Sequence, residues 1–233
     1  MLYNLARPLA EQFILFNLFR YITFRSGAAC LTALAVSFWL GPKLIRWLRT
    51  VQRNGQPIRD DGPERHLIEK KGTPTMGGLL ILFAMTISTL LWVDLRNGYV
   101  WAVLVVTWGY GVLGFTDDYL KVTHSNHKGV SGRIKLIVQA LIGFGAAVWI
   151  VLLTRAPLGT ELTVPVFKEV MIPLGMLFPI FAMLVMMGAS NEVNLTDGLD
   201  GLAIVPTMIT AGVFALIAYL VGNRIFADYL QLI

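Results

Sequence analysis

Two adjacent carboxylates, Asp117 and Asp118, directly follow a run of twenty uncharged residues, in the motif "GFTDDYLKV". Neighbours on a helix point about 100° apart, so the two side chains should face different partners. Lys121 follows Asp117 by four residues and should share its face. A carboxylate beside an ammonium suits phosphate chemistry, and two close carboxylates can bind Mg²⁺ or keep one of the pair basic. The alternative is a pair of hydrated carboxylates at a helix end.

A second polar cluster, "NLTDGLDG", separates two strongly apolar stretches. Asn194, Asp197 and Asp200 recur at every third residue, so a helical turn would align them. Gly198 and Gly201 would let a ligand approach the backbone closely. The spacing does not match an EF-hand loop. A polar loop with Asp-Gly turns is the alternative interpretation.

A third motif, "EKKGTPTMGGLLILF", places lysines and threonines before an apolar run. Pro74 is expected in the first turn of the following helix, where proline is tolerated. A helix start beside Lys70, Lys71 and Thr75 could bind an anion. The order of residues is not that of a P-loop, and basic residues at a helix end are common without any function.

The elements that must position these motifs are membrane helices. The chain has 233 residues, of which 56% are hydrophobic and 14% charged, whereas soluble domains carry about 25% charged residues. Six stretches free of Asp, Glu, Lys and Arg are each close to the roughly 20 residues that a spanning helix needs. They are 26–42, 72–93, 98–116, 136–154, 170–191 and 201–223. The predicted fold is an all-α polytopic membrane protein with six transmembrane helices.

The remaining features indicate neither a cleaved leader nor a metal site. Residues 1–20 combine arginines with aromatic residues and are predicted to form an interfacial helix. Cys30 lies within the first apolar stretch and is interpreted as a buried membrane thiol, with no disulfide framework. His66, His124 and His127 are best interpreted as solvated loop histidines.

Lysine and arginine placement predicts the orientation of the helices. Segment 43–71 contains eight basic residues and segment 121–135 four, against one, two and one in the other loops and the tail. The first, third and, by parity, fifth loops are therefore predicted to be cytoplasmic, with the N-terminus outside. All three polar clusters then face the cytoplasm.

These motifs together resemble a known family. "KKGTPTMGG", "GFTDDYLKV", "VNLTDGLDGLA" and "RDDGPERH" are similar to motifs of the polyprenyl-phosphate N-acetylhexosamine-1-phosphate transferases, and the similarity extends through essentially all 233 residues. Within that family, the combination most resembles the members that use UDP-MurNAc-pentapeptide.

The resemblance implies a Mg²⁺-dependent transfer of phospho-MurNAc-pentapeptide from UDP-MurNAc-pentapeptide to undecaprenyl phosphate. The products would be lipid I and UMP, in the first membrane step of peptidoglycan synthesis for the bacterial cell wall. It implies a multi-pass protein of the inner membrane, in contact with membrane lipid and with a homodimer as its candidate assembly. No nucleic-acid partner is expected.

The motifs carry expected roles onto individual residues. Asp117 and Asp118 match the paired active-site aspartates of the family. The residues matching polar groups around the nucleotide and phosphates are Lys70, Thr75, Lys121 and Lys135. The residues matching the nucleotide-sugar cluster are Asn194, Asp197 and Asp200.

The family pattern extends further than this sequence. The family has about ten spans, and its later part supplies a magnesium-binding aspartate and a histidine-rich loop, both beyond Ile233. We therefore expect residues 1–233 to form a single transmembrane domain that is incomplete at its C-terminus and inactive alone. Asp117 and Asp118 are the candidate metal ligands within the chain.

Several alternatives stay open at this point. Either the lipid phosphate attacks the donor directly, or Asp117 or Asp118 first forms a phospho-aspartyl intermediate. An alternative donor is UDP-GlcNAc, giving GlcNAc-1-phosphate transfer to the same lipid. A catalytically incomplete membrane subunit is a further alternative, and a transporter is disfavoured because no transport-type repeat is found.

Overall fold

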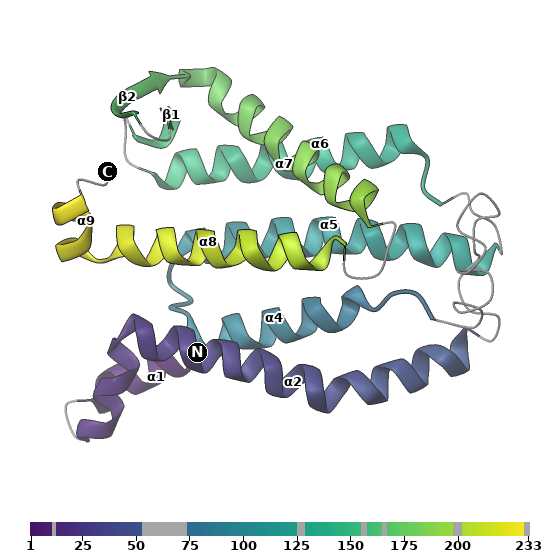
Figure 1. The fold of residues 1–233 in the computed structure, drawn as a ribbon, viewed down its shortest axis with the longest axis horizontal. Helices are drawn as coiled ribbons and strands as arrows, with labels where there is room; N and C mark the ends of the chain where they lie inside the picture. Colours follow the sequence, from purple (N-terminus) through teal and green to yellow (C-terminus); the bar gives the residue numbers. More distant parts are fainter. Residues whose placement is uncertain are drawn as a thin grey trace. The chain divides into compact units, whose positions relative to one another are not determined.

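Helices dominate the computed structural model (Figure 1). It describes residues 1–10, 13–52, 74–124, 129–154, 158–164, 167–197 and 202–230. They divide into two compact units, Met1–Ile142 and Gly143–Ile233. The elements are α1 (Leu2–Leu9), η1 (Ile14–Arg20), α2 (Ile22–Val51), α4 (Gly78–Trp92), α5 (Gly98–Thr123), α6 (Gly132–Leu153), η2 (Leu158–Thr160), β1 (Glu161–Val164), β2 (Phe167–Pro173), η3 (Gly175–Leu177), α7 (Phe178–Thr196), α8 (Ile204–Gly222) and α9 (Arg224–Leu230).

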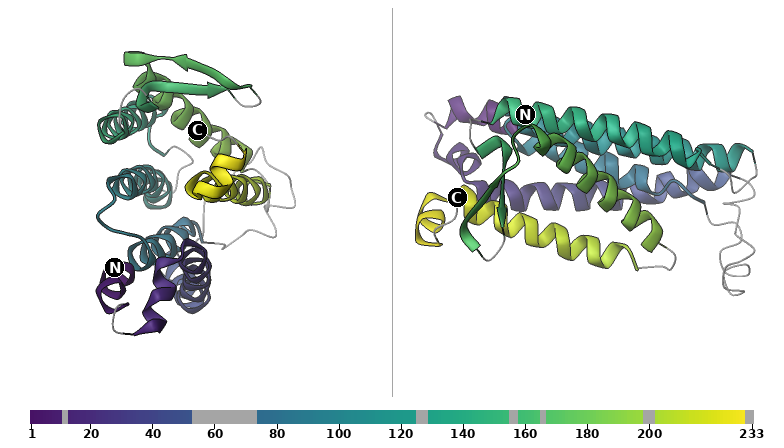
Figure 2. Two further views of the ribbon diagram at one scale, coloured as in Figure 1. Left: turned by 90° about the vertical axis from the view of Figure 1, so that its left-hand side faces the viewer. Right: turned by 90° about the horizontal axis from the view of Figure 1, so that it is seen from above.

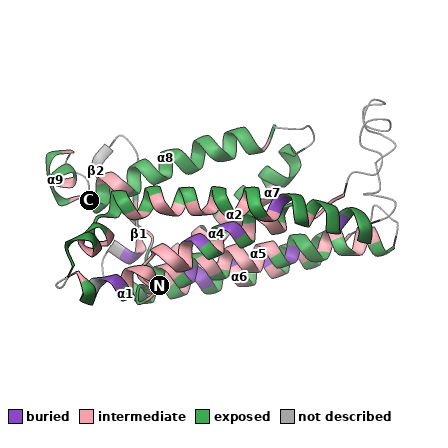
Figure 3. Ribbon diagram, turned by 90° about the horizontal axis from the view of Figure 1, so that it is seen from below, coloured by how far each residue is buried: buried purple, intermediate pink, exposed green. Residues whose placement is uncertain are grey.

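Five helical segments of the described chain are long and apolar enough to cross a membrane: α2, α5, α6, η3 with α7, and α8. The sixth predicted span corresponds to α4, which is apolar but has only 15 residues. The all-α membrane fold is therefore confirmed. Figure 3 shows α8 exposed along nearly its whole length. An apolar helix without a polar face is stable only against lipid or other protein.

The N-terminal end of α4 differs from the prediction. The second apolar stretch was expected to become helical near Gly72, with Pro74 in the first turn, whereas α4 begins at Gly78. The backbone of Met76 has φ 70°, in the left-handed region, and the backbone of Thr75 is bound by the Gln52 side chain. Residues 74–76 therefore lie outside the helix, and the prediction for Pro74 was wrong.

A β-hairpin before α7 is a second feature that the apolar stretches did not predict. Stretch 170–191 was expected to be one helix, but its first four residues belong to β2. β1 and β2 are antiparallel, with Glu161 opposite Pro173 and Leu162 opposite Ile172. β-Branched residues favour strands, and this hairpin contains Thr163, Val164, Val170 and Ile172. Gly175, at φ +51°, turns the chain towards α7.

Helix α4 packs against both α2 and α5 (Figure 2). The Ser88 hydroxyl donates to the Ala29 carbonyl of α2 at 2.6 Å, and the Trp108 indole of α5 donates to the Thr86 hydroxyl at 2.8 Å. A Cβ at Gly111 would lie 2.6 Å from Leu82 Cδ1, so α5 approaches α4 at a glycine. Small residues and side-chain hydrogen bonds of this kind hold helices together in lipid, where apolar burial alone gives little preference.

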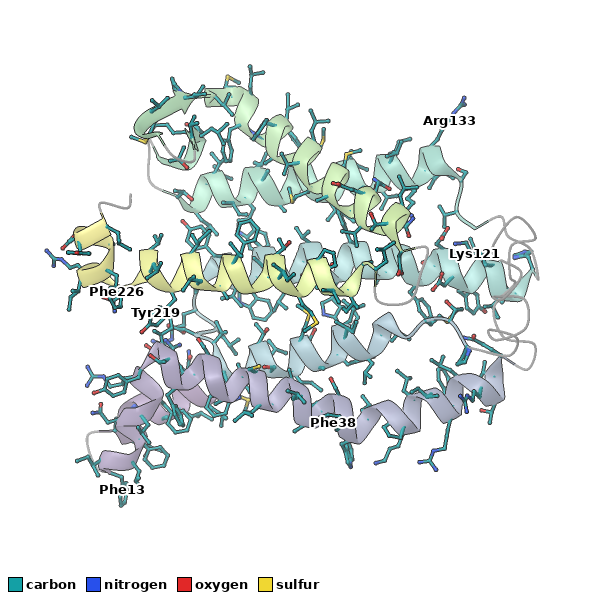
Figure 4. All side chains as sticks on the ribbon, viewed as in Figure 1. Phe13, Phe38, Lys121, Arg133, Tyr219 and Phe226 are labelled. Atoms are coloured by element: carbon teal, nitrogen blue, oxygen red, sulfur yellow. The ribbon has the colours of Figure 1, made fainter. Side chains whose placement is uncertain are left out.

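The two ends of the first unit differ in residue type, with aromatic side chains at one end and carboxylates at the other. At one end, Phe19 of η1 stacks on Trp92 of α4 with ring centroids 5.5 Å apart. The carboxylates of α5 lie at the other end, as Phe13 and Lys121 mark in Figure 4. The N-terminal segment consists of two short helices, α1 and η1, rather than one helix. Its interfacial position stays a prediction.

Candidate active site

Asp118 faces the segment that precedes α4. The Thr75 hydroxyl donates to Asp118 Oδ2 at 2.8 Å, although the two residues are 43 positions apart. Among the described residues, the second oxygen, Oδ1, has no hydrogen-bond partner. One oxygen of this carboxylate is thus oriented by Thr75.

Asp117 faces a different neighbour, as expected for adjacent residues on a helix. Its Oδ2 lies 2.6 Å from Lys121 Nζ, and its Oδ1 accepts the Val130 backbone N–H at 2.8 Å. The Asp117 side chain is only 15% exposed. Lys135, one turn into α6, adds a second positive charge that acts on the same carboxylate. Each oxygen of Asp117 thus has a partner in the protein.

Gly129 and Val130, which precede α6, pack closely against Asp117. A Cβ added at Gly129 would overlap Asp117 Oδ1 and lie 3.0 Å from Lys121 Cε. Glycine is therefore needed at this position for the Val130 N–H to reach the carboxylate. In Figure 4, the side chain of Arg133 at the start of α6 points away from Lys121.

Thr75 is itself held by a buried side chain at the end of α2. Gln52, 5% exposed, accepts the Thr75 N–H at 2.9 Å through Oε1. Its Nε2 donates to the Thr75 carbonyl at 3.3 Å. The amide thus binds both backbone groups of one residue, whose side chain in turn binds Asp118. The ends of α2, α5 and α6 and the segment before α4 meet at this point.

The site is suited to bind a phosphorylated ligand with a divalent cation. Mg²⁺ is commonly held by one or two carboxylates together with substrate phosphate oxygens and water. Asp118 Oδ1 fits such a ligand role, since Asp118 keeps its orientation through Oδ2. The described residues contain no group of three or more His, Cys, Asp or Glu side chains that could hold a metal unaided. Lys121 and Lys135 supply positive charge for phosphate.

The second predicted cluster lies in the other unit. Asn194 is exposed in the last turn of α7, and Asp197 caps that helix outside the helical conformation. The predicted helical alignment therefore ends at Asp197. A cavity of about 600 Å³ lies between α7 and α8, lined mainly by apolar side chains with Glu192 at its polar part. Lys70 and Asp200 lie outside the described residues.

The sequence predicted Asp117, Asp118, Thr75 and Lys121 as site residues, and the structure places them close together. It did not predict the residues that hold them in place. Gln52 carries no local signal, because it is one polar residue at the end of a basic helix. The Val130 contact is made by a backbone N–H, which no residue type reveals. Gly129 was a weak signal, as a glycine next to a polar loop.

Residues 100–233 match the family described as "Glycosyl transferase family 4", which covers more than half of the chain. The chain belongs to glycosyl transferase family 4. Residues 70–82 of this family-4 chain also match "Phospho-N-acetylmuramoyl-pentapeptide-transferase signature 1". That signature contains Thr75, Met76 and the first turn of α4, and so includes the partner of Asp118.

Curated relatives agree with this assignment. A phospho-N-acetylmuramoyl-pentapeptide-transferase of Granulibacter bethesdensis is 75% identical over 232 residues, covering 100% of this chain and 64% of the relative. Proteins of the same name from Gluconacetobacter diazotrophicus and Maricaulis maris are 57% and 53% identical, covering 100% and 99% of the chain and 64% of each relative. The chain thus spans about 64% of the length of these relatives.

Proposed function

We propose that the protein transfers phospho-MurNAc-pentapeptide from UDP-MurNAc-pentapeptide to undecaprenyl phosphate, releasing UMP and forming lipid I. The observation that carries this proposal is the contact between Thr75, within the transferase signature, and Asp118, one of two adjacent carboxylates. The names of the curated relatives support the choice of donor.

The reaction is a phosphoryl-group displacement without redox change. An oxygen of the lipid phosphate forms a bond to the β-phosphorus of the UDP-sugar. The bond from that phosphorus to the bridging oxygen breaks, and its electron pair leaves with UMP. Positioning and charge stabilisation provide most of the catalysis in such transfers.

The contacts favour different roles for the two carboxylates. Asp118, oriented by Thr75 through Oδ2, is proposed to contact the reacting phosphates or their counter-ion through Oδ1. Asp117 is occupied by Lys121 and Val130, so it holds the lysine ammonium where negative charge develops. This arrangement favours direct attack over a phospho-Asp117 intermediate, because a paired carboxylate is a poor nucleophile. Lys70, Lys135, Asn194, Asp197 and Asp200 remain proposed substrate contacts.

A divalent cation, proposed to be Mg²⁺, would neutralise charge on the diphosphate when bound. Asp118 Oδ1 is the ligand that this chain offers at the described site, with the remaining ligands from phosphate oxygens and water. Asp118 would keep that oxygen directed because Thr75 holds the opposite one.

The site is proposed to face the bacterial cytoplasm, from the inner membrane. The excess of lysine and arginine in segments 43–71 and 121–135 supports this orientation. The soluble nucleotide donor would then reach the carboxylates from water, while the lipid phosphate reaches them from the bilayer. The N-terminus outside and a homodimer stay predictions of the sequence.

The test is UMP release by the protein purified from its own membrane, with undecaprenyl phosphate and Mg²⁺. UDP-MurNAc-pentapeptide and UDP-GlcNAc are supplied in parallel. Release with the muramoyl donor alone, and its loss with EDTA, is the expected result. Release with UDP-GlcNAc alone would replace the proposed donor, and release with neither would refute the proposed function.

A further inference from the structure

Gln52 is the most buried polar side chain near the candidate site and was not among the predicted site residues. It follows the last turn of α2 as the residue that caps this helix, and its backbone N–H donates to Leu48 O at 2.8 Å. Its side chain has 5% relative exposure. A buried amide needs hydrogen-bond partners, since an unsatisfied one is costly.

Both ends of this amide are used on one residue. Oε1 accepts from the Thr75 N–H at 2.9 Å, and Nε2 donates to the Thr75 carbonyl at 3.3 Å. Nε2 also lies 3.6 Å from Met76 Sδ. The side chain therefore binds both backbone groups of Thr75, which lies in a bend just before α4 and outside the helix.

The fixed residue is the one that orients Asp118. Without Gln52, nothing else described binds the Thr75 backbone, and Met76 sits at φ 70°, which costs a non-glycine residue energy. Relaxation of this segment would move the Thr75 hydroxyl from its 2.8 Å contact with Asp118. The geometry points to Gln52 as a positioning residue, which orients Asp118 through Thr75. This inference rests on the proposed function.

The first test compares two variants in the purified, full-length protein. Gln52→Met keeps the length and volume of the side chain but removes both hydrogen bonds, whereas Gln52→Ala also leaves a cavity. Both should lower kcat about 10- to 100-fold, with the donor KM changed less than about threefold, as for other supporting contacts. Gln139→Met is the matched control, because Gln139 is also buried, at 2% exposure, and should stay within about threefold of the wild type. A Gln52→Met variant with wild-type kcat would overturn the inference.

A double-mutant cycle tests whether Gln52 acts through Thr75. Thr75→Val removes only the hydroxyl that contacts Asp118. Once that hydroxyl is absent, adding Gln52→Met should lower kcat by less than about twofold more, since coupled residues are not additive. If the fold-decrease in kcat of the double variant equals the product of the two single fold-decreases, Gln52 does not act through Thr75.

A readout independent of activity separates this inference from the proposed function. Amide hydrogen exchange at Thr75 should speed up in Gln52→Met and stay unchanged in Gln139→Met, because Gln52 Oε1 is the acceptor of that N–H. Unchanged amide hydrogen exchange at Thr75 in Gln52→Met would refute the positioning role of Gln52, even if the enzyme releases UMP. Failure of the wild type to release UMP from either donor would refute the proposed function while leaving the exchange result valid.

Discussion

Gly129→Ala is the smallest change that tests the geometry around Asp117. The added methyl group would overlap Asp117 Oδ1 and crowd Lys121 Cε. Asp117 cannot rotate away freely, because Oδ2 is paired with Lys121 and Oδ1 accepts the Val130 N–H. Either the carboxylate or the loop must therefore move by about 1 Å to restore van der Waals contact.

The free-energy cost of that movement is set by the hydrogen bond and the ion pair that it weakens. A backbone N–H donating to a charged carboxylate contributes about 1.5–3 kcal/mol, whereas a partly exposed i,i+4 ion pair contributes only about 0.3–0.5 kcal/mol. The hydrogen bond from Val130 therefore dominates, and we expect the free energy of unfolding to fall by about 2 kcal/mol. For a chain of this size that lowers Tm by roughly 4–8 °C. An active-site displacement of about 1 Å should also lower kcat up to about 100-fold.

The assay measures Tm in detergent and UMP release on the same preparations. Gly132→Ala is the matched control, because a Cβ at Gly132 meets nothing within 4 Å and alanine favours the helix that begins there. We expect this control to keep the wild-type kcat and an equal or slightly higher Tm. Equal behaviour of the two alanine variants would refute the close packing of Gly129 on Asp117.

Two further predictions test the other carboxylate and the strained segment before α4. Asp118→Asn should lower kcat about 100- to 1000-fold with little change in donor KM. Asp228→Asn is the control and should keep the wild-type rate, because Asp228 is 75% exposed and forms only an exposed ion pair. An active Asp118→Asn variant would remove Asp118 from the mechanism. Met76→Ile should lower Tm by several degrees, because φ 70° is strained for a β-branched residue. Met76→Gly should not lower Tm, because glycine adopts this φ without strain. Equal Tm values for the two variants would contradict the left-handed conformation of residue 76.

Local patterns in the sequence were sufficient to predict most of the membrane helices and the proximity of Asp117 and Lys121. Uncharged stretches of membrane length predicted the positions of α2, α5, α6 and α8, because the bilayer requires about 20 apolar residues per span. The spacing of Asp117 and Lys121 predicted their ion pair, now seen at 2.6 Å. The rotation of about 100° between neighbours predicted that Asp118 would face elsewhere.

The length of an apolar stretch gave a wrong helix boundary in two places, where backbone hydrogen bonds favoured another conformation. The start of α4 and the β2 strand both lie in stretches apolar enough for helix. In the first, the Gln52 amide takes the Thr75 backbone groups that a helix would use. In the second, Met171, Ile172 and Pro173 pair with β1 instead of starting a helix.

The sequence by itself determined the class of fold, which depends on composition, and the family resemblance, which depends on short motifs. It also indicated Asp117 and Lys121 as neighbours within one helical turn. Only the tertiary structure decided the partners of each carboxylate. Thr75 reaches Asp118 across 43 residues, and Gln52 reaches Thr75 across 23. Such contacts depend on how α2, α4 and α5 pack, and the spacing of residues along one helix carries no information about that packing.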